Sequence, residues 1–420
     1  MDILVIGGGG REHAICYALN KSPKVNKIYC LPGNAGISEI AECVDISVMD
    51  FDAIRSFVKS NKNIDMVMVA PDDPLAGGLV DLLEADGVRV FGPNKNAAII
   101  EGSKSFSKYL MKKYSIPTAD YEEFTEYEKA VDYVKNAKYP LVVKADGLAL
   151  GKGVVIANDF DEAKAALSDM MIDMKFKAAG SKVIVEEFLV GKEVSILAFT
   201  DGKTIVPMVS SQDHKRAYDN DEGLNTGGMG TFSPSKVYTK EIEKEVTEKI
   251  ILPTVNAMNS EGRTFKGVIY FGLMLTSDGV KVLEYNARFG DPETQVVLPR
   301  LRTDIVDIFN AVIDGKLDTL NIEWDDNACV CVILASGGYP ESYEKGLPIS
   351  IGELDEDVML FHAGTKSDGN GGYVTSGGRV LGVTCTGKDI EDARAKAYKN
   401  IENIQFKNMH YRKDIGIKLK

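Results

Sequence analysis

The sequence lacks the spacing of cysteine and histidine that a zinc site requires. Its six cysteines form no CxxC pair and its four histidines are far apart in the chain, so zinc coordination is not expected. Cys329 and Cys331 lie in ACVCVILA, where alternate positions share one face of a buried strand, which favours core packing over redox chemistry. We therefore expect reduced thiols and a cytoplasmic protein.

Long hydrophobic runs and an excess of positive charge are also missing. No apolar run reaches membrane-spanning length, and the N-terminal MDILVIGGGG has neither the basic flank nor the cleavage site of a signal peptide. The net charge of -13 argues against a general nucleic-acid partner, because such binding needs clustered cations. We expect a monomer whose partners are small molecules, with neither nucleic acid nor a membrane among them.

The pattern of apolar runs predicts a multidomain protein of α/β and α+β type. In residues 1–101 short apolar runs alternate with helical stretches, which predicts a parallel α/β domain with candidate binding loops at the ends of its strands. Longer β-branched runs and glycine turns in residues 102–326 predict an α+β domain with antiparallel hairpins. Residues 327–420 predict a small C-terminal α/β domain.

The N-terminal glycine turn, GGGGREH, does not complete a dinucleotide-binding motif. Counted from Gly7 and Gly9, the third glycine site holds Glu12, and the next strand ends without a ribose-binding carboxylate, so NAD is not expected. Two interpretations stay open for this turn. Its backbone amides, at a helix N-terminus, can bind some other phosphate, or the turn only lets strand and helix pack closely.

A second glycine-rich run, KADGLALGKGV from Lys144 to Val154, lacks the hydroxyl of a Walker motif. Val154 follows Gly153, which excludes a Walker-type NTPase. Exposed amides and two lysines are typical of a cover over nucleotide phosphates, although a solvated hairpin has the same composition. The following EEFLVGKE predicts a hinge for adenine with a carboxylate for ribose, or simply glutamates beside a turn.

A metal site is predicted in VLEYNARFGDPE. Glu284 and Asn286 are two residues apart, so a strand directs both side chains to one face, and hard oxygen ligands suit Mg²⁺ that bridges ATP phosphates. Arg288 points the same way if the strand continues, and it can pair with a carboxylate or a phosphate. We favour this interpretation over an acidic strand end, which does not explain why Glu, Asn and Arg recur at alternate positions.

With these segments in order, the chain resembles the ATP-grasp ligases, and within them the phosphoribosylamine–glycine ligases of purine biosynthesis. The resemblance runs through GGGGREHA, PGNAG, LVVKADGLALGKGVV, EEFLVGKEVS, QDHKRAYDNDEGLNTGGMG, EYNARFGDPETQ, HAGT, GGRVLGV and YRKDIG. It implies an ATP-grasp fold with a pre-ATP-grasp domain at residues 1–101 and a lid at about residues 119–188. It also implies ligation of glycine to 5-phosphoribosylamine, in which ATP phosphorylates glycine to glycyl phosphate and the products are glycinamide ribonucleotide, ADP and phosphate.

The resemblance also implies roles for individual residues. Those expected at the ATP phosphates are Lys104, Lys144, Gly151 and Gly153, and those at adenosine are Glu186, Phe188, Leu189 and Glu193. Mg²⁺ or Mn²⁺ would bind Glu284 and Asn286. Asp213 and Arg288 would orient glycine or the ribosylamine, and Lys144 would assist phosphoryl transfer. The phosphoribosyl group would meet Gly10, Asn34, Lys366 and Arg379, the last two of which have equally good structural interpretations.

Two features depart from the family's usual pattern. Ala70, Pro71 and Asp72 stand where Gly-Pro-Glu is common, so contacts from that loop are not assigned. The apolar strand GVIYFGLML carries no acid beside the metal strand, so phosphate oxygens and water would have to complete the metal's shell. We also expect no fused purine enzyme. The rival functions are another ATP-grasp ligase or carboxylase, and a non-catalytic regulator that binds ATP without turnover.

Overall fold

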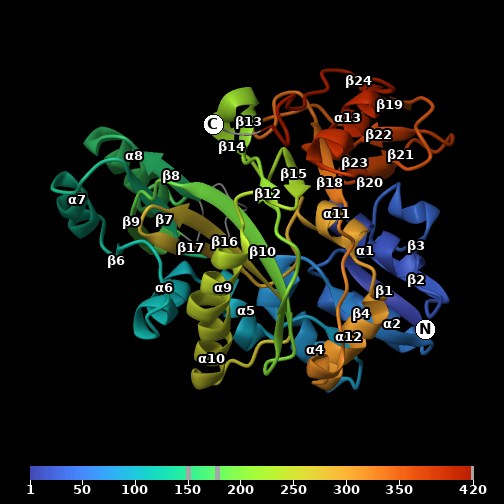
Figure 1. The fold of residues 1–420 in the computed structure, drawn as a ribbon, viewed down its shortest axis with the longest axis horizontal. Coiled ribbons are helices and arrows are strands. Elements are labelled where there is room, and N and C mark those ends of the chain that lie inside the picture. Colours follow the sequence, from blue (N-terminus) through green and yellow to red (C-terminus); the bar gives the residue numbers. More distant parts are fainter. Residues whose placement is uncertain (148–152, 176–179, 418–420) are drawn as a thin grey trace.

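The computed structural model describes residues 1–147, 153–175 and 180–417. The N-terminal part contains a parallel sheet in the order β3-β2-β1-β4-β5 (Figure 1). Its strands are β1 (Asp2–Gly7), β2 (Lys27–Pro32), β3 (Glu42–Cys43), β4 (Ile64–Val69) and β5 (Val90–Phe91). Residues 3–6 of β1 are fully buried, because helices cover both faces of a parallel sheet. The predicted parallel domain is confirmed.

The helices of this part are α1 (Gly10–Asn20), α2 (Phe51–Ser60), α3 (Asp72–Gly77) and α4 (Leu79–Ala85). The sequence predicts one helix near residues 75–86, and the structure has two. Gly78 between them has a φ of 91°, a left-handed conformation that glycine adopts without penalty and that ends a helix.

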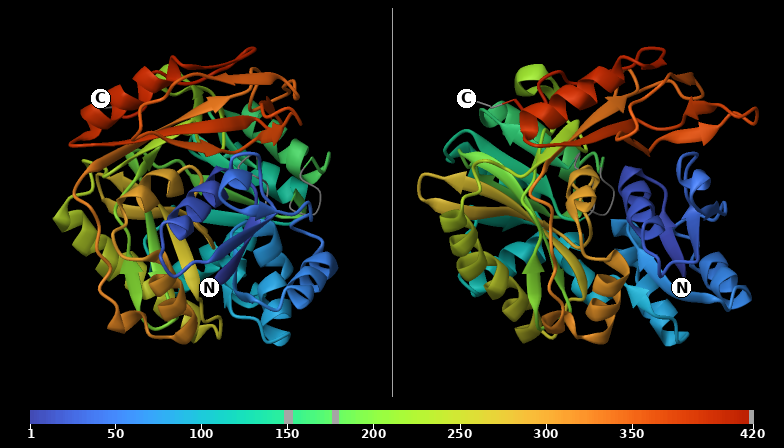
Figure 2. Two further views of the ribbon diagram at one scale, coloured as in Figure 1. Left: turned by 90° about the vertical axis from the view of Figure 1, so that its right-hand side faces the viewer. Right: turned by 45° about the vertical axis from the view of Figure 1, so that its right-hand side comes forward.

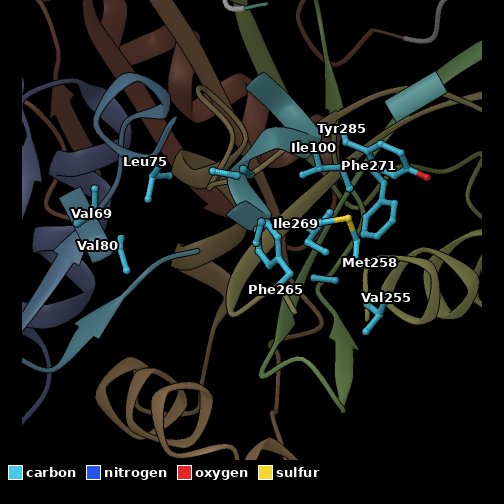
Figure 3. Packing of buried hydrophobic residues seen from close by; sticks show 14 of the residues in the cluster. Val69, Leu75, Val80, Ile100, Val255, Met258, Phe265, Ile269, Phe271 and Tyr285 are labelled. Atoms are coloured by element: carbon cyan, nitrogen blue, oxygen red, sulfur yellow. The ribbon is translucent and has the colours of Figure 1, made fainter. Parts of the chain in front are cut away.

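The central sheet is antiparallel, in the order β11-β10-β16-β17. It comprises β10 (Lys192–Thr200), β11 (Ile205–Pro207), β16 (Gly267–Thr276) and β17 (Gly279–Asn286), with the predicted hairpin between the last two. The neighbouring helices are α5 (Lys95–Gly102), α6 (Lys104–Lys113), α9 (Lys240–Val246) and α10 (Leu252–Ser260). One hydrophobic cluster joins this sheet to the N-terminal one, from Val69 and Leu75 to Phe271 and Tyr285 (Figure 3).

A smaller antiparallel sheet lies at the opposite end of the molecule from the N-terminal domain (Figure 1). Its order is β6-β9-β7-β8, and its strands are β6 (Tyr121–Phe124), β7 (Leu141–Ala145), β8 (Val154–Ala157) and β9 (Val183–Glu187). With α7 (Tyr127–Lys135) and α8 (Phe160–Met171) it encloses its own hydrophobic cluster. We call this unit the lid sheet, since it falls in the range expected for a lid.

The C-terminal part contains two sheets, with orders β12-β15-β18-β23-β20 and β21-β22-β19-β24. The first is formed by β12 (Gln212–Asp213), β15 (Gly230–Ser233), β18 (Ala328–Ala335), β20 (Met359–His362) and β23 (Arg379–Gly387). The second is formed by β19 (Pro348–Ile351), β21 (Thr365–Ser367), β22 (Tyr373–Thr375) and β24 (Ile404–Phe406). Helix α13 (Ile390–Ile401) packs on β18 and β23, and Figure 2 shows these elements along one side of the molecule.

Two strands of this C-terminal sheet come from the long polar segment at residues 211–233. Between β12 and β15 this segment also forms the hairpin of β13 (Arg216–Tyr218) and β14 (Glu222–Asn225). Pairing of β15 with β18 ties the segment to the C-terminal sheet. Short helices α11 (Thr294–Val297) and α12 (Ile305–Asp314) lead from the central sheet to β18. No described helix is long and apolar enough to cross a membrane.

Candidate active site

A cavity of about 1190 Å³ is bordered by the central, lid and C-terminal sheets, and the N-terminal part contributes Arg11 of α1 and Asp72 of α3. It gathers most of the residues singled out from the sequence: Lys104, Lys144, Gly153, Glu186, Phe188, Leu189, Glu193, Asp213, Glu284, Asn286, Arg288 and Arg379. Gly10, Asn34 and Lys366 do not line it, and Gly151 lies outside the described residues. One cavity therefore joins the predicted nucleotide, metal and acyl-acceptor residues.

A β-bulge directs the predicted metal ligands into this cavity. Glu284 pairs with Gly272 but Val282 pairs with Leu273, so Leu283 is an extra residue in β17. Val282 before the bulge and Tyr285 after it both lie in the hydrophobic core. Without the extra residue, strict alternation would place Glu284 on the same face as Val282. The bulge turns Glu284 and Asn286 away from the core.

Glu101, at the end of α5, organises the neighbourhood of Asn286 and Arg288. Its Oε1 lies 2.9 Å from Arg288 Nη2, and its Oε2 accepts a hydrogen bond of 2.7 Å from the Ala287 amide. With the Asn286 amide nitrogen facing it, Asn286 donates to Glu101 Oε1 at 2.9 Å, which leaves the amide oxygen turned elsewhere. Burial raises the pKa of Glu101 to about 6 although Arg288 opposes the shift.

Glu101 lines the cavity and contacts Arg288, but it was not singled out from the sequence. The one available signal is an acid after the apolar run AAII at the end of a helix. Arg288 points to the same region, and its Nε is buried without a hydrogen-bond partner among the described residues. A buried guanidinium with a free donor is suited to an anionic ligand.

Lys215 is a second residue missed from the sequence. Its Nζ lies 3.1 Å from Glu193 Oε2 and 3.7 Å from Glu284 Oε1. Lys215 therefore bridges Glu193, which is expected to bind the ribose, and Glu284, which is expected to bind the metal. Glu193 is the main cause of a strongly raised Lys215 pKa. Enclosure in the cavity raises the pKa of Glu284, but Lys215, Lys144 and Lys104 outweigh this and hold it below its usual value. Glu284 is therefore ionised.

Asp213 lines the cavity from β12, a strand of the C-terminal sheet. Burial and the nearby Glu293 raise its pKa well above the ordinary value. Gly228 packs against it: a Cβ there would come within 2.7 Å of Asp213 Oδ1, and the φ of Gly228 is 109°. The glycines of the 211–233 segment thus allow its backbone to approach this carboxyl closely.

The lid side of the cavity carries cations and an apolar cluster. Lys144 Nζ donates to Glu186 Oε2 at 2.9 Å and to Leu283 O at 3.3 Å, while Lys104 Nζ donates to Gly147 O at 2.7 Å. Beside them lies a small apolar cluster whose members all line the cavity: Ala119, Leu189, Met274 and Leu283. This wall combines positive charge with a surface on which a flat aromatic ring can pack.

Arg379 connects the C-terminal sheet to Asp291, in the loop that follows β17. It donates to Asp291 O at 2.8 Å and Asp291 Oδ2 at 2.9 Å, and it also bonds Gly227 O. These contacts give Arg379 a structural role. Lys366 is exposed on β21, in the other C-terminal sheet. Lys366 and Arg379 thus belong to different sheets, and their joint contact with the phosphoribosyl group stays a prediction.

Gly10 and Asn34 lie where the N-terminal and C-terminal parts meet. Asn34 Nδ2 donates to Gly8 O at 3.0 Å and to His362 O at 2.7 Å. A Cβ at Gly10 would come within 2.7 Å of Gln295 Nε2, so this position favours glycine. The tight turn that packs strand against helix is thus present, and phosphate binding by the turn stays a prediction.

Family models match the chain in three consecutive parts. They describe the N domain (residues 1–101), the ATP-grasp (A) domain (residues 102–294) and the C domain (residues 329–418) of phosphoribosylglycinamide synthetase. The chain belongs to the phosphoribosylglycinamide synthetase family. It is accordingly an ATP-using ligase, and the expected ATP-grasp fold is confirmed.

Relatives of this synthetase family agree over the full length. A phosphoribosylamine–glycine ligase of Caldanaerobacter subterraneus subsp. tengcongensis is 51% identical, covering 99% of this chain and 99% of its own. The crystal structure of the Thermotoga maritima phosphoribosylamine–glycine ligase is 34% identical with a TM-score of 0.86, covering 99% of this chain and 100% of its own. A biotin carboxylase from Campylobacter jejuni, 14% identical with a TM-score of 0.75 over 99% of this chain and 94% of its own, shares the fold alone.

Proposed function

We propose that the chain ligates glycine to 5-phosphoribosylamine with ATP, giving glycinamide ribonucleotide, ADP and phosphate in purine biosynthesis. The observation that carries this proposal is one cavity in which Lys104 and Lys144, the Glu284 and Asn286 pair, and Arg288 with Asp213 meet. Phosphoryl transfer needs the lysines and the metal ligands, and the glycine and amine substrates need Arg288 and Asp213. The name of the full-length relative, phosphoribosylamine–glycine ligase, supports this reaction.

A divalent cation fits the Glu284 and Asn286 pair. Glu284 is ionised, and the Asn286 amide keeps its oxygen free when its nitrogen faces Glu101. The described residues contain no group of three or more His, Cys, Asp and Glu side chains suited to a metal, so the two β17 ligands need phosphate oxygens and water beside them. When bound there, Mg²⁺ or Mn²⁺ supplies positive charge to the ATP phosphates.

ATP fits the lid side of the cavity. The adenine ring packs on the apolar cluster of Leu189, Met274 and their neighbours, and Glu193 takes the ribose hydroxyls. Glu186 Oε1 is buried without a partner in the part of the chain that the structure describes, so it can accept a donor of the adenine. Lys104, Lys144 and the glycine-rich segment that includes Gly153 hold the phosphates.

The reaction then proceeds in two transfers. A carboxylate oxygen of glycine, oriented by Arg288, attacks the γ-phosphorus of ATP; the bond to the bridging oxygen breaks and ADP leaves. The amine of 5-phosphoribosylamine next attacks the carbonyl carbon of glycyl phosphate, and the carbon–oxygen bond breaks to release phosphate. Asp213 lines the cavity, and in its ionised form it can accept the proton lost by this amine; the raised pKa makes that form a stronger base than an ordinary carboxylate.

Glycyl phosphate must be protected from water between the two transfers. The lid sheet borders the cavity through Val142, Val154 and Ile156, and the 211–233 segment borders it through Asp213, Thr226 and Gly227. We assign both segments to this shielding.

We also propose domain boundaries after residues 101 and 326, and a cytoplasmic monomer. The phosphoribosyl contacts at Gly10, Asn34, Lys366 and Arg379 remain part of the proposal.

The proposal is tested by phosphate release from ATP with each substrate omitted in turn. We expect rapid release only when glycine and freshly generated 5-phosphoribosylamine are both present, because the acyl phosphate is held until the amine arrives. An amine-independent release at the full rate would point to another carboxylate ligase or an ATPase. ATP binding without any release would instead indicate a regulator.

A further inference from the structure

Lys108 is a buried cation of α6 that the reaction described above does not use. Its side chain is 3% exposed, although lysine is rarely so buried without a partner. Its ammonium group has three oxygen neighbours: Thr118 Oγ1 at 2.8 Å, Ala119 O at 3.3 Å and Glu186 Oε2 at 3.1 Å. These match the three donors of an ammonium group, so Lys108 is fixed in place.

Glu186 is shared between Lys108 and Lys144. Both ammonium groups approach the same oxygen, Oε2, at 3.1 Å and 2.9 Å. All three residues line the cavity, but the side chains of Lys108 and Glu186 are each only 3% exposed, whereas that of Lys144 is 11% exposed. The three residues come from α6, β9 and β7, so the arrangement joins the lid sheet to the body of the molecule.

The charges of this trio do not cancel. Two ammonium groups and one carboxylate leave a single positive charge, and we place it at Lys144, the most exposed of the three side chains that line the cavity. If Lys108 were neutral, Glu186 would neutralise Lys144, and electrostatic attraction in a buried site is strong enough to hold Lys144 away from a ligand. Lys108 thus affects how much charge Lys144 can offer to an anion.

We propose that Lys108 is a positioning residue that balances Glu186 and so leaves the positive charge of Lys144 available to the ATP phosphates. This inference rests on the assignment of Lys144 to those phosphates in the proposed function, and it requires no contact between Lys108 and the nucleotide. It distinguishes Lys108 from Lys104 and Lys144, which act on the phosphates directly. Burial lowers the pKa of Lys108 to about 8 against the opposing effect of Glu186, so the carboxylate is what keeps this ammonium charged near neutral pH.

The test measures the equilibrium dissociation constant of Mg-ATP in the full-length protein. We expect Lys108→Met to raise it about tenfold, since the variant loses one positive charge from the trio. Lys108→Arg keeps the charge and should stay within about threefold of the parent. The matched control is Lys112→Met on the exposed side of the same helix, which should leave the constant unchanged.

The double variant Lys108→Met with Glu186→Gln separates charge from structure. Glutamine at position 186 keeps an oxygen that can accept the adenine donor, and removal of both charges restores the single positive charge at Lys144, so ATP affinity should return most of the way to that of the parent. A purely structural role predicts that the double variant binds no better than Lys108→Met, and that result overturns the proposal, as does unchanged binding by Lys108→Met itself. Should Lys108→Met not fold, Lys108→Gln replaces it in both variants under the same expectations.

This measurement does not depend on turnover. If glycine and 5-phosphoribosylamine proved to be the wrong substrates, phosphate release would fail while the pattern of ATP affinities would be unaffected. Failure of the affinity pattern with normal phosphate release would remove the role of Lys108 and leave the proposed function in place. The two experiments therefore report on separate claims.

Discussion

Glu284→Gln is expected to lower kcat by about 10³-fold or more while leaving the fold intact. The substitution keeps the shape of the side chain and removes the charged one of the two predicted metal ligands. Charge stabilisation by a bound metal contributes several kcal/mol to such a transition state, and each 1.36 kcal/mol corresponds to about tenfold in rate. The side chain is 38% exposed, so its replacement should cost little stability. Steady-state turnover and thermal unfolding measure the two effects.

The matched control for this experiment is Glu248→Gln. Glu248 is 61% exposed and its Oε1 lies 3.9 Å from Lys244 Nζ, a surface pair that contributes little. Normal activity is expected for this variant. Retained activity in Glu284→Gln, with the same metal requirement, would show that the metal is held elsewhere and that β17 is not its site.

Arg288→Met is expected to lower kcat/KM for glycine by about 10²-fold, because orientation of the reacting carboxylate is lost. The Arg288 side chain is 18% exposed, its Nη2 contacts Glu101 and its buried Nε has no partner among the described residues. Removing the guanidinium also removes the counter-charge of Glu101. The pKa of that carboxyl, already about 6, should rise further, so Glu101 should become protonated at neutral pH.

The effect should be specific to glycine. ATP affinity in Arg288→Met is expected to stay within a few-fold of the parent, because Lys104 and Lys144 are untouched. Arg302→Met is the control, since Arg302 is 59% exposed and its Nε lies 3.6 Å from Asp325. A variant that lost affinity for ATP and glycine equally would place Arg288 at the nucleotide instead of the acyl substrate.

The sequence predicted the fold well where a local pattern determines the structure. Alternation of apolar runs and helices gave the parallel N-terminal sheet, and the turn at Asp278 and Gly279 gave the β16–β17 hairpin. The strands of the segment at residues 211–233 were harder to predict. Its strands β12 and β15 are short and polar, and they become strands by pairing within a sheet whose other members begin at residue 328. A pairing across about 100 residues leaves no local signal.

The candidate site, too, could be predicted from the sequence only in part. The recurrence of Glu284 and Asn286 at alternate positions was visible, but the bulge at Leu283 that turns them from the core was not. Glu101 and Lys215 were missed, because their roles depend on partners distant in the chain, such as Arg288 and Glu284. Lys366 and Arg379 were both expected at the phosphoribosyl group, and the structure places them in different sheets. Sequence spacing identifies ligands on one strand, whereas charge networks between domains become visible only in the three-dimensional structure.

The most direct test of the ligase mechanism follows the carboxylate oxygens of glycine. Glycine labelled with ¹⁸O in both carboxylate oxygens is incubated with the enzyme, ATP and 5-phosphoribosylamine, and the products are analysed by mass spectrometry. Formation of glycyl phosphate predicts one ¹⁸O atom in the released phosphate and one in the amide carbonyl of glycinamide ribonucleotide. Release of unlabelled phosphate would mean that the carboxylate never attacks ATP, and it would contradict the proposed function of this cavity.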